Sequence, residues 1–277
     1  MQGDGPGDQT HRQICDTGPM PFMTASASTF AASFDTTVPI DRAESMFRAI
    51  WSASITATAT PDHQTVLSCC VIALFAVIFS PVWRITRNAI TIAHEGGHAL
   101  MATLCGRRVN GIQMHSDTSG LTVSQGKSRG IGLRLTQFSG YAAPALWGLA
   151  CAALVSRGYS TASLWLLVIL LILMLLKIRN GYGLLAVVAV SVGVIVLSWW
   201  GSADLRSQAA HVLAWFLLFG AIRPLFELIH QRRTGRAAGS DADQLATTGA
   251  PAGLWIVIWL SMSLGALWLG STWMLSL

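Results

Sequence analysis

About seven long apolar segments follow one another along the chain after residue 64. They cover residues 65–83, 86–105, 137–156, 161–178, 181–200, 207–230 and 254–275. Each is close to the roughly 20 residues that a helix needs to cross the hydrocarbon of a bilayer. Lipid offers no partner to an unpaired backbone amide, so such segments must be helical. The sequence therefore predicts an all-α polytopic membrane protein with about seven transmembrane helices.

The distribution of charge supports a bilayer as the solvent. Charged residues make up only 11% of the 277 residues, against 52% hydrophobic residues, whereas soluble domains carry about 25% charge. The formal net charge of +5 could indicate nucleic acid as a partner. The basic residues, however, lie in short loops between apolar segments, which is typical of orientation in a membrane. We therefore expect a lipid bilayer and no nucleic acid among the partners.

Three basic loops predict the orientation in the membrane. They follow the second, fourth and sixth apolar segments and contain Arg107, Arg108, Lys127, Arg129, Arg134, Lys177, Arg179, Arg232, Arg233 and Arg236. All three fall on one side if every segment spans, and loops rich in Lys and Arg stay in the cytoplasm. The C-terminus is then predicted to lie outside the cell.

The first 62 residues differ from the rest of the chain. Residues 1–62 are rich in Gly, Pro, Ser, Thr and Asp and show no sustained periodicity. Such a composition cannot bury enough apolar surface to order the chain. We interpret residues 1–62 as a disordered cytoplasmic tail and residues 63–277 as one membrane domain.

The loop between the second and third segments has a pattern of its own. Val109, Ile112 and Met114 form one short apolar-polar stretch, and Leu121 and Val123 form a second. The residues between them, Ser-Asp-Thr-Ser-Gly at 116–120, are turn formers. This arrangement predicts a short β-hairpin, with an irregular loop as the alternative.

The second segment carries a His-Glu-x-x-His motif made of His94, Glu95 and His98. Histidines four positions apart on a helix share one face and can reach one zinc ion at about 2.0–2.1 Å. Glu95 is close enough to take a proton from a metal-bound water, which makes it the candidate catalytic base. Ionisable groups inside an apolar segment are costly and usually functional. The motif predicts a metal site, which could also be non-catalytic.

The run at residues 93–100, Ala-His-Glu-Gly-Gly-His-Ala-Leu, resembles the site-2 protease family of intramembrane zinc metalloproteases. The resemblance is in particular to its short bacterial multi-span branch. The resemblance implies that residues 63–277 form a multi-pass metalloprotease domain in a bacterial cell membrane, with Zn²⁺ as cofactor. It also implies a membrane-anchored protein substrate, cut in or near its transmembrane segment. In the family, an aspartate from a later segment completes the zinc site.

A third protein ligand is needed, because catalytic zinc sites use three protein ligands and a water. Residues 240–246, Ser-Asp-Ala-Asp-Gln-Leu-Ala, are similar to the Ser-Asp-Ala signature that precedes the final span in this branch. The resemblance implies Asp241 as the ligand, with Asp243 as the runner-up. The alternative is a helix start, in which Ser240 is the N-cap and Asp243 the third helical residue.

Two further positions carry hypotheses of lower weight. Asn180 opens the fifth segment, and the resemblance implies that it holds a substrate carbonyl; an interfacial turn is the alternative. Arg223 and Glu227 are four residues apart and are predicted to pair along their helix. Pro224 predicts a kink beside them.

Other classes of function remain open at this stage. A transporter or a non-catalytic metal-binding membrane protein could use both histidines but would leave Glu95 without a role. Transporters often show internal repeats with discontinuous helices, and the sequence contains no convincing repeat. An inactive protease relative that only binds client helices would have the same residues as the enzyme.

Overall fold

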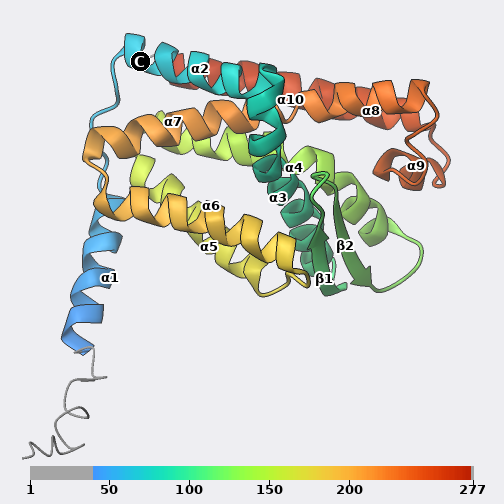
Figure 1. Cartoon of the computed structure of the whole chain (residues 1–277), viewed down its shortest axis with the longest axis horizontal. Coiled ribbons are helices and arrows are strands. Elements are labelled where there is room, and N and C mark those ends of the chain that lie inside the picture. Colours follow the sequence, from blue (N-terminus) through green and yellow to red (C-terminus); the bar gives the residue numbers. More distant parts are fainter. Residues whose placement is uncertain (1–39, 276–277) are drawn as a thin grey trace, which may run out of the picture. The chain divides into compact units, whose positions relative to one another are not determined.

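The protein is described by a computed structural model that covers residues 40–275, with side chains from residue 44 (Figure 1). The elements in chain order are α1 (Ile40–Ile55), α2 (His63–Ile78), α3 (Ser80–Leu104), β1 (Arg108–Met114), β2 (Gly120–Gln125), α4 (Ile131–Val155), α5 (Ser160–Leu175), α6 (Gly181–Trp200), α7 (Ala203–Gly220), α8 (Arg223–Arg233), α9 (Asp241–Ala246) and α10 (Ala252–Leu275). The chain divides into two compact units, Met1–Met46 and Phe47–Leu277. The second unit contains every element from α2 onwards.

The predicted tail of residues 1–62 lies mostly outside the described residues, which begin at residue 40. Its last part contains α1, a helix that the apolar pattern did not predict. Asp62, the final residue of this range, caps α2 by accepting a hydrogen bond from the Thr65 backbone N–H at 2.6 Å. The helix α2 thus begins at His63 with a side-chain cap before it.

All seven apolar segments are helical, but the count of seven spans is not confirmed. Among residues 40–275, four helical stretches are long and apolar enough to cross a membrane: Ile131–Val155, Gly181–Trp200, Ala203–Arg233 and Ala252–Leu275. A fifth is added when α2 and α3 are counted together as one bent pair. The helix α5 has only 16 residues. The structure therefore supports an integral membrane protein with four to five candidate spans in the part of the chain that it describes.

The first two predicted spans are parts of one broken pair because the chain bends by 98° between α2 and α3. Phe79 has an extended backbone (φ −74°, ψ 108°) and separates the two helices. Pro81 follows in the first turn of α3, where the missing N–H costs nothing, whereas deeper in a helix proline would break it. The apolar pattern predicts that the boundary between the two helices lies between residues 83 and 86. Because Pro81 is suited to the first turn of a helix, the boundary lies at Phe79 instead.

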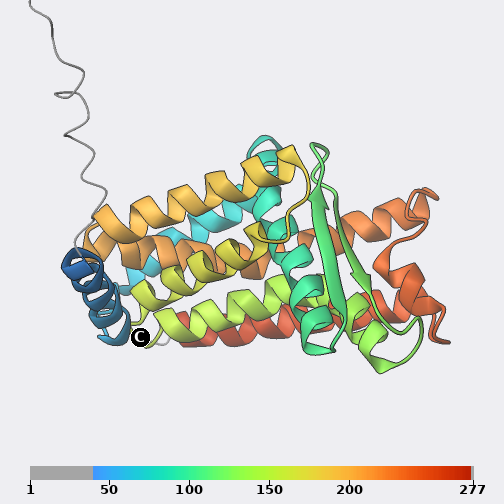
Figure 2. The ribbon, with the colours of Figure 1, turned by 90° about the horizontal axis from the view of Figure 1, so that it is seen from below.

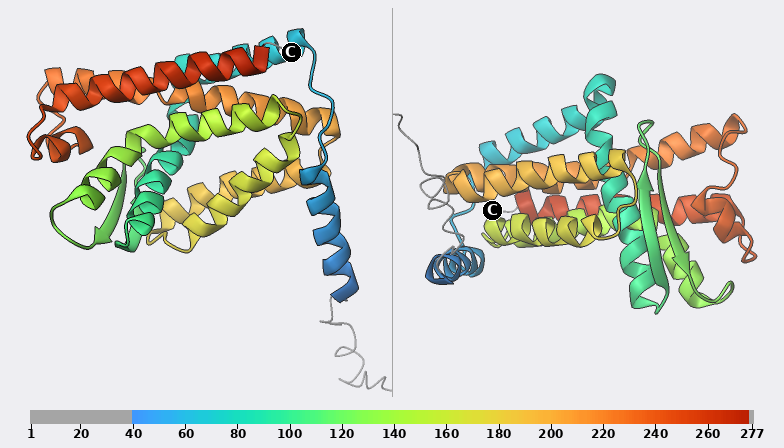
Figure 3. Two further views of the ribbon diagram at one scale, coloured as in Figure 1. Left: turned by 180° about the vertical axis from the view of Figure 1, so that it is seen from behind. Right: turned by 60° about the horizontal axis from the view of Figure 1, so that its bottom comes forward.

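After this bend, α3 runs across the other long helices. Figures 1 and 2 show α2, α7 and α10 following one direction and α3 crossing it. The helix α4 packs against α3, α7 and α10 (Figure 3). The helix with the His-Glu-x-x-His motif is therefore held on one side by α4 and lies across the bundle.

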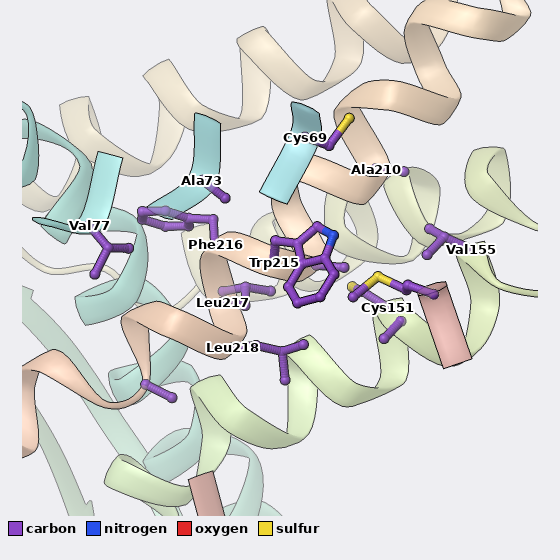
Figure 4. Close-up of a cluster of buried hydrophobic side chains, with 14 of the residues drawn as sticks. Cys69, Ala73, Val77, Cys151, Val155, Ala210, Trp215, Phe216, Leu217 and Leu218 are labelled. Atoms are coloured by element: carbon purple, nitrogen blue, oxygen red, sulfur yellow. The ribbon is translucent and has the colours of Figure 1, made fainter. Parts of the chain in front are cut away.

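A core of buried side chains joins α2, α4 and α7 (Figure 4). Trp215 of α7 is its largest fully enclosed side chain, and Cys69 and Cys151 pack around it as free cysteines. Small residues let these helices approach closely. A Cβ atom at Gly148, for example, would lie 2.9 Å from the backbone nitrogen of Leu218. The cysteines therefore serve packing, as small apolar residues do.

The predicted β-hairpin is confirmed. The strands β1 and β2 pair antiparallel, with a register shift between Val109 and Gly111. Asp117 stabilises the turn by accepting a hydrogen bond from the Ser119 backbone N–H at 2.9 Å. Thr118 adopts a left-handed conformation (φ 67°) there, which is uncommon for a residue other than glycine.

The two edges of the hairpin differ. The outer edge of β1 is bonded to the α5–α6 connection: Ile112 donates to Lys177 O at 2.8 Å, and Arg179 donates to Ile112 O at 2.9 Å. The strand β2 makes no backbone–backbone hydrogen bond to any element other than β1 within residues 40–275. The outer edge of β2 is therefore open.

The predicted pair of Arg223 and Glu227 is confirmed, with Nε and Oε1 3.4 Å apart. Glu227 also accepts a hydrogen bond from Trp83 Nε1 at 2.9 Å and pairs with Arg87 at 3.3 Å. Arg223 donates to the carbonyl oxygens of Val77 and Ile78, the last residues of α2. The start of α8 thus holds both sides of the α2–α3 bend.

The structure gives a testable topology. We expect a cysteine beside Lys127 and a cysteine added after Leu277 to lie on opposite sides of the membrane. Five helical stretches separate the two positions: α4, α5, α6, the α7–α8 pair and α10. If α5 spans despite its length, the chain crosses the membrane an odd number of times between the two cysteines. In a variant without native cysteines, an impermeant thiol reagent on intact cells should label only the C-terminal position. Equal labelling would mean that α5 does not cross.

Candidate metal centre

The two histidines of the motif stand one turn apart on α3, as their spacing predicts. Their ring centroids are 4.7 Å apart, with the ring planes at 82°. The Nε2 atoms of His94 and His98 are 3.1 Å apart, so both nitrogens point to one place. Glu95, between them in sequence, is only 3% exposed.

A backbone carbonyl fixes the orientation of His98. Its Nδ1 lies 2.6 Å from Thr136 O on α4. A carbonyl can only accept, so Nδ1 must carry a proton, and Nε2 is the nitrogen that can offer a lone pair to a metal ion. Histidine ligands of metals are usually held by such a second hydrogen bond. The motif did not predict Thr136, because nothing in its local sequence shows that its carbonyl lies beside α3.

Asp241 completes the group. Its Oδ2 lies 3.1 Å from His94 Nε2 and 3.2 Å from His98 Nε2, and its side chain is 15% exposed. Burial by itself would raise the pKa of Asp241, but the neighbouring His98 and His94 outweigh it and hold that pKa well below its usual range. A carboxylate in this setting stays ionised and can act as a ligand.

The distances fit a single metal ion. Ligand atoms about 2.0–2.1 Å from a tetrahedral zinc ion are about 3.4 Å from one another, close to the three spacings observed here. His94, His98 and Asp241 could together hold a metal ion, since one ligand atom from each lies within 4.8 Å of the others. Two imidazole nitrogens and a carboxylate oxygen are a donor set that suits zinc.

The wall opposite the histidines is shaped by a glycine. A Cβ atom at Gly140 of α4 would collide with the His98 ring and lie 2.7 Å from His94 Nε2. Only glycine therefore leaves room for both imidazoles at this point of α4. The next residue, Tyr141, meets the His94 ring edge to face at 4.7 Å between centroids.

Asp243 has a different place. Its side chain forms an ion pair with Arg232, and its backbone N–H donates to Ser240 Oγ. The hydrogen bond that the Arg232 guanidinium donates to the Asp243 carboxylate lowers the pKa of Asp243. The helix-start interpretation is thus right for Ser240 and Asp243, while Asp241, the first residue of the same short helix, faces the histidines.

Asn180 does not join the group. Its Nδ2 donates to Met114 O at 2.5 Å, and its Oδ1 accepts from the Met114 N–H at 3.1 Å. The side-chain amide therefore completes the outer edge of β1, and Asn180 is not among the residues that line the cavity. The idea that it holds a substrate carbonyl gains no support from this geometry, because both polar atoms already have backbone partners.

The metal-binding group lies in a cavity of about 600 Å³. The walls come from α3, the strand β2 with its turn, α4 and α9, and include Thr91, Glu95, Thr122, Tyr141, Asp241 and Gln244. Thr91 Oγ1 donates to Thr118 O at 2.8 Å and ties the hairpin turn to α3. The open strand and the metal-binding group therefore share one cavity.

Comparison with known families gives one match over most of the chain. The family model described as Peptidase M50B-like matches residues 67–270. That range includes His94, Glu95, His98 and Asp241. No curated protein and no solved structure matches the chain.

Proposed function

We propose that this chain, which belongs to the Peptidase M50B-like family of membrane metalloproteases within the site-2 protease family, is a zinc endopeptidase. Its proposed substrates are membrane-anchored proteins, which it cuts in or near their transmembrane segment. The observation that carries the proposal is the convergence of His94, His98 and Asp241 on one point beside Glu95. The family model supports a metalloprotease as the class of reaction, and the geometry supports these residues as the ones proposed to perform it.

The proposed ligands of zinc are His94 Nε2, His98 Nε2 and Asp241 Oδ2. When bound, Zn²⁺ would lower the pKa of a water molecule and polarise the scissile carbonyl. Thr136 keeps the Nε2 lone pair of His98 directed at the site. Asp241 contributes the negative charge that offsets part of the charge of the cation.

Glu95 is proposed as the general base and then the general acid. It accepts a proton from the attacking water and later delivers it to the amine that leaves when the peptide bond breaks. It follows His94 directly in the chain, and it is not a member of the metal-binding group. Glu95 is also among the residues that line the cavity, where the peptide bond is proposed to lie.

The open edge of β2 is the proposed place for the substrate. A helical segment hides its backbone, so it must unwind before water can attack its peptide bond. An unwound segment can add to a free strand edge through main-chain hydrogen bonds. The strand β2 offers such an edge inside the cavity that holds Glu95.

Removal and return of the metal test the proposed function. Purified protein in lipid vesicles should cleave a single-span membrane protein, lose this activity after treatment with a chelator, and regain it when Zn²⁺ is added. Cleavage that continues unchanged in chelated protein of verified zero metal content would contradict the proposal. So would complete inactivity of zinc-loaded protein towards a panel of single-span substrates.

A further inference from the structure

The strand that is open to a substrate also touches the proposed base. Thr122 of β2 lies with its Oγ1 2.6 Å from Glu95 Oε2 and 3.2 Å from the Glu95 backbone oxygen. A threonine hydroxyl has a single proton to donate. The shorter contact is to the carboxylate, and hydrogen bonds to a charged acceptor are the stronger ones. The hydroxyl proton of Thr122 is therefore donated to Glu95 Oε2.

This hydroxyl is the only side-chain or backbone donor to the Glu95 carboxylate within residues 44–275. Glu95 is 3% exposed, and a buried carboxylate without hydrogen-bond donors is costly. The backbone of β2 also confines the Glu95 carboxylate sterically. A Cβ atom at Gly120 would collide with Glu95 Oε1 and lie 2.6 Å from Glu95 Cγ, so the backbone of β2 packs directly against the Oε1 side of the carboxylate.

The alternation of the strand explains why both contacts come from β2. Side chains along a strand point alternately to its two faces. Gly120 and Thr122 are on the half-buried face of β2, whereas Leu121 and Val123 are exposed. One face of a single strand thus confines the Glu95 carboxylate and also supplies its hydrogen bond.

We propose that Thr122 is a positioning residue for the general base, an inference that rests on the proposed function. By holding Oε2, it leaves Oε1, which lies beside Gly120 and accepts no hydrogen bond from residues 44–275, as the oxygen that exchanges a proton with the attacking water. Thr122 lies on the strand whose edge is proposed to receive the substrate, so the strand that binds the substrate also fixes the base. Its loss should therefore slow the chemical step and leave binding largely unchanged.

The hairpin has other anchors, so Thr122 is not needed to place it. Thr91 ties the turn to α3 through Thr118 O. The outer edge of β1 is bonded to the segment of Lys177 and Arg179. Removal of the Thr122 hydroxyl therefore leaves the strand in position and releases only the carboxylate.

Three variants in lipid vesicles test the proposal. Thr122→Val removes the hydroxyl and keeps the shape, and Thr122→Ser keeps the hydroxyl. Thr103→Val makes the same change as the first on α3, where the Thr103 hydroxyl only donates to the helix carbonyl of Ala99 at 2.8 Å. The measurements are kcat and KM for a single-span substrate, and zinc content by elemental analysis.

We expect kcat of Thr122→Val to fall by about 10-fold to 100-fold, the usual loss when an orienting partner is removed, with KM and zinc content unchanged. Thr122→Ser and Thr103→Val should keep wild-type kcat. The proposal is overturned if Thr122→Val turns over at the wild-type rate, if Thr122→Ser is equally slow, or if the defect lies in KM or zinc content. Each outcome presupposes an active wild-type enzyme, whose inactivity would instead refute the proposed function.

Discussion

Replacement of Glu95 by Gln is expected to reduce cleavage of a membrane-anchored substrate by about 10²-fold to 10⁴-fold, the usual contribution of a general base. The amide of Gln cannot take up the proton of the attacking water. Glutamine has nearly the same shape, and Glu95 does not belong to the metal-binding group, so bound zinc should remain at the wild-type level. Steady-state cleavage and zinc content measured on the same preparation check both parts.

Asp204→Asn is a matched control for this substitution. It makes the same carboxylate-to-amide change at an exposed position in the first turn of α7, and it should leave cleavage at the wild-type rate. If Glu95→Gln cleaves as fast as this control, Glu95 is not the base. If it loses zinc together with activity, the loss cannot be assigned to proton transfer.

Replacement of Asp241 by Ala is expected to remove most of the bound metal. Loss of groups that merely orient a ligand weakens metal sites by about 10-fold to 100-fold, and loss of a ligand should cost at least as much. His94 and His98 alone would then hold the ion. Zinc affinity, measured by competition with a chromogenic chelator, should fall accordingly, and cleavage should fall with it.

Asp243→Ala provides the control on the same helix. It removes a carboxylate two residues away whose partner is Arg232, and partly exposed ion pairs contribute only about 0–1 kcal/mol to stability. Zinc affinity should therefore stay near the wild-type value. Full zinc retention in the Asp241→Ala and Asp243→Ala double variant would refute the three-ligand site.

The parts of the site that depend on short spacing could be predicted from the sequence. The spacing of His94 and His98 places both on one helical face whatever surrounds the helix. The alternation at residues 109–123 likewise predicts a hairpin without knowledge of its neighbours. These features are local, and the physical rule that generates them acts within a few residues.

The remaining parts depend on contacts between distant segments. Asp241 and Asp243 are two residues apart on α9, and only the packing of α9 beside α4 decides which one faces the histidines. Asn180 pairs with Met114, 66 positions earlier in the chain. Thr122 and Gly140 matter through their contacts with Glu95 and the imidazoles, which leave no mark in the local sequence.

The number of spans shows a further limit of hydropathy. An apolar segment has a length but no direction, so two neighbouring segments look like two crossings even where the chain turns by 98° between them. The turn depends on Phe79 and Pro81 and on the way Arg223 holds the end of α2. That last contact joins residues about 145 positions apart, so a hydropathy average over roughly 20 neighbouring residues cannot detect it.

The unequal edges of the hairpin have a consequence for stoichiometry. The outer edge of β1 is already bonded to the α5–α6 connection, so the sheet can grow on one side only and by one strand at a time. If the substrate adds to β2 as proposed, each protein molecule should bind a single substrate segment, and two substrates should exclude each other. An extended peptide that resists hydrolysis would then act as a competitive inhibitor, titrating the enzyme one to one.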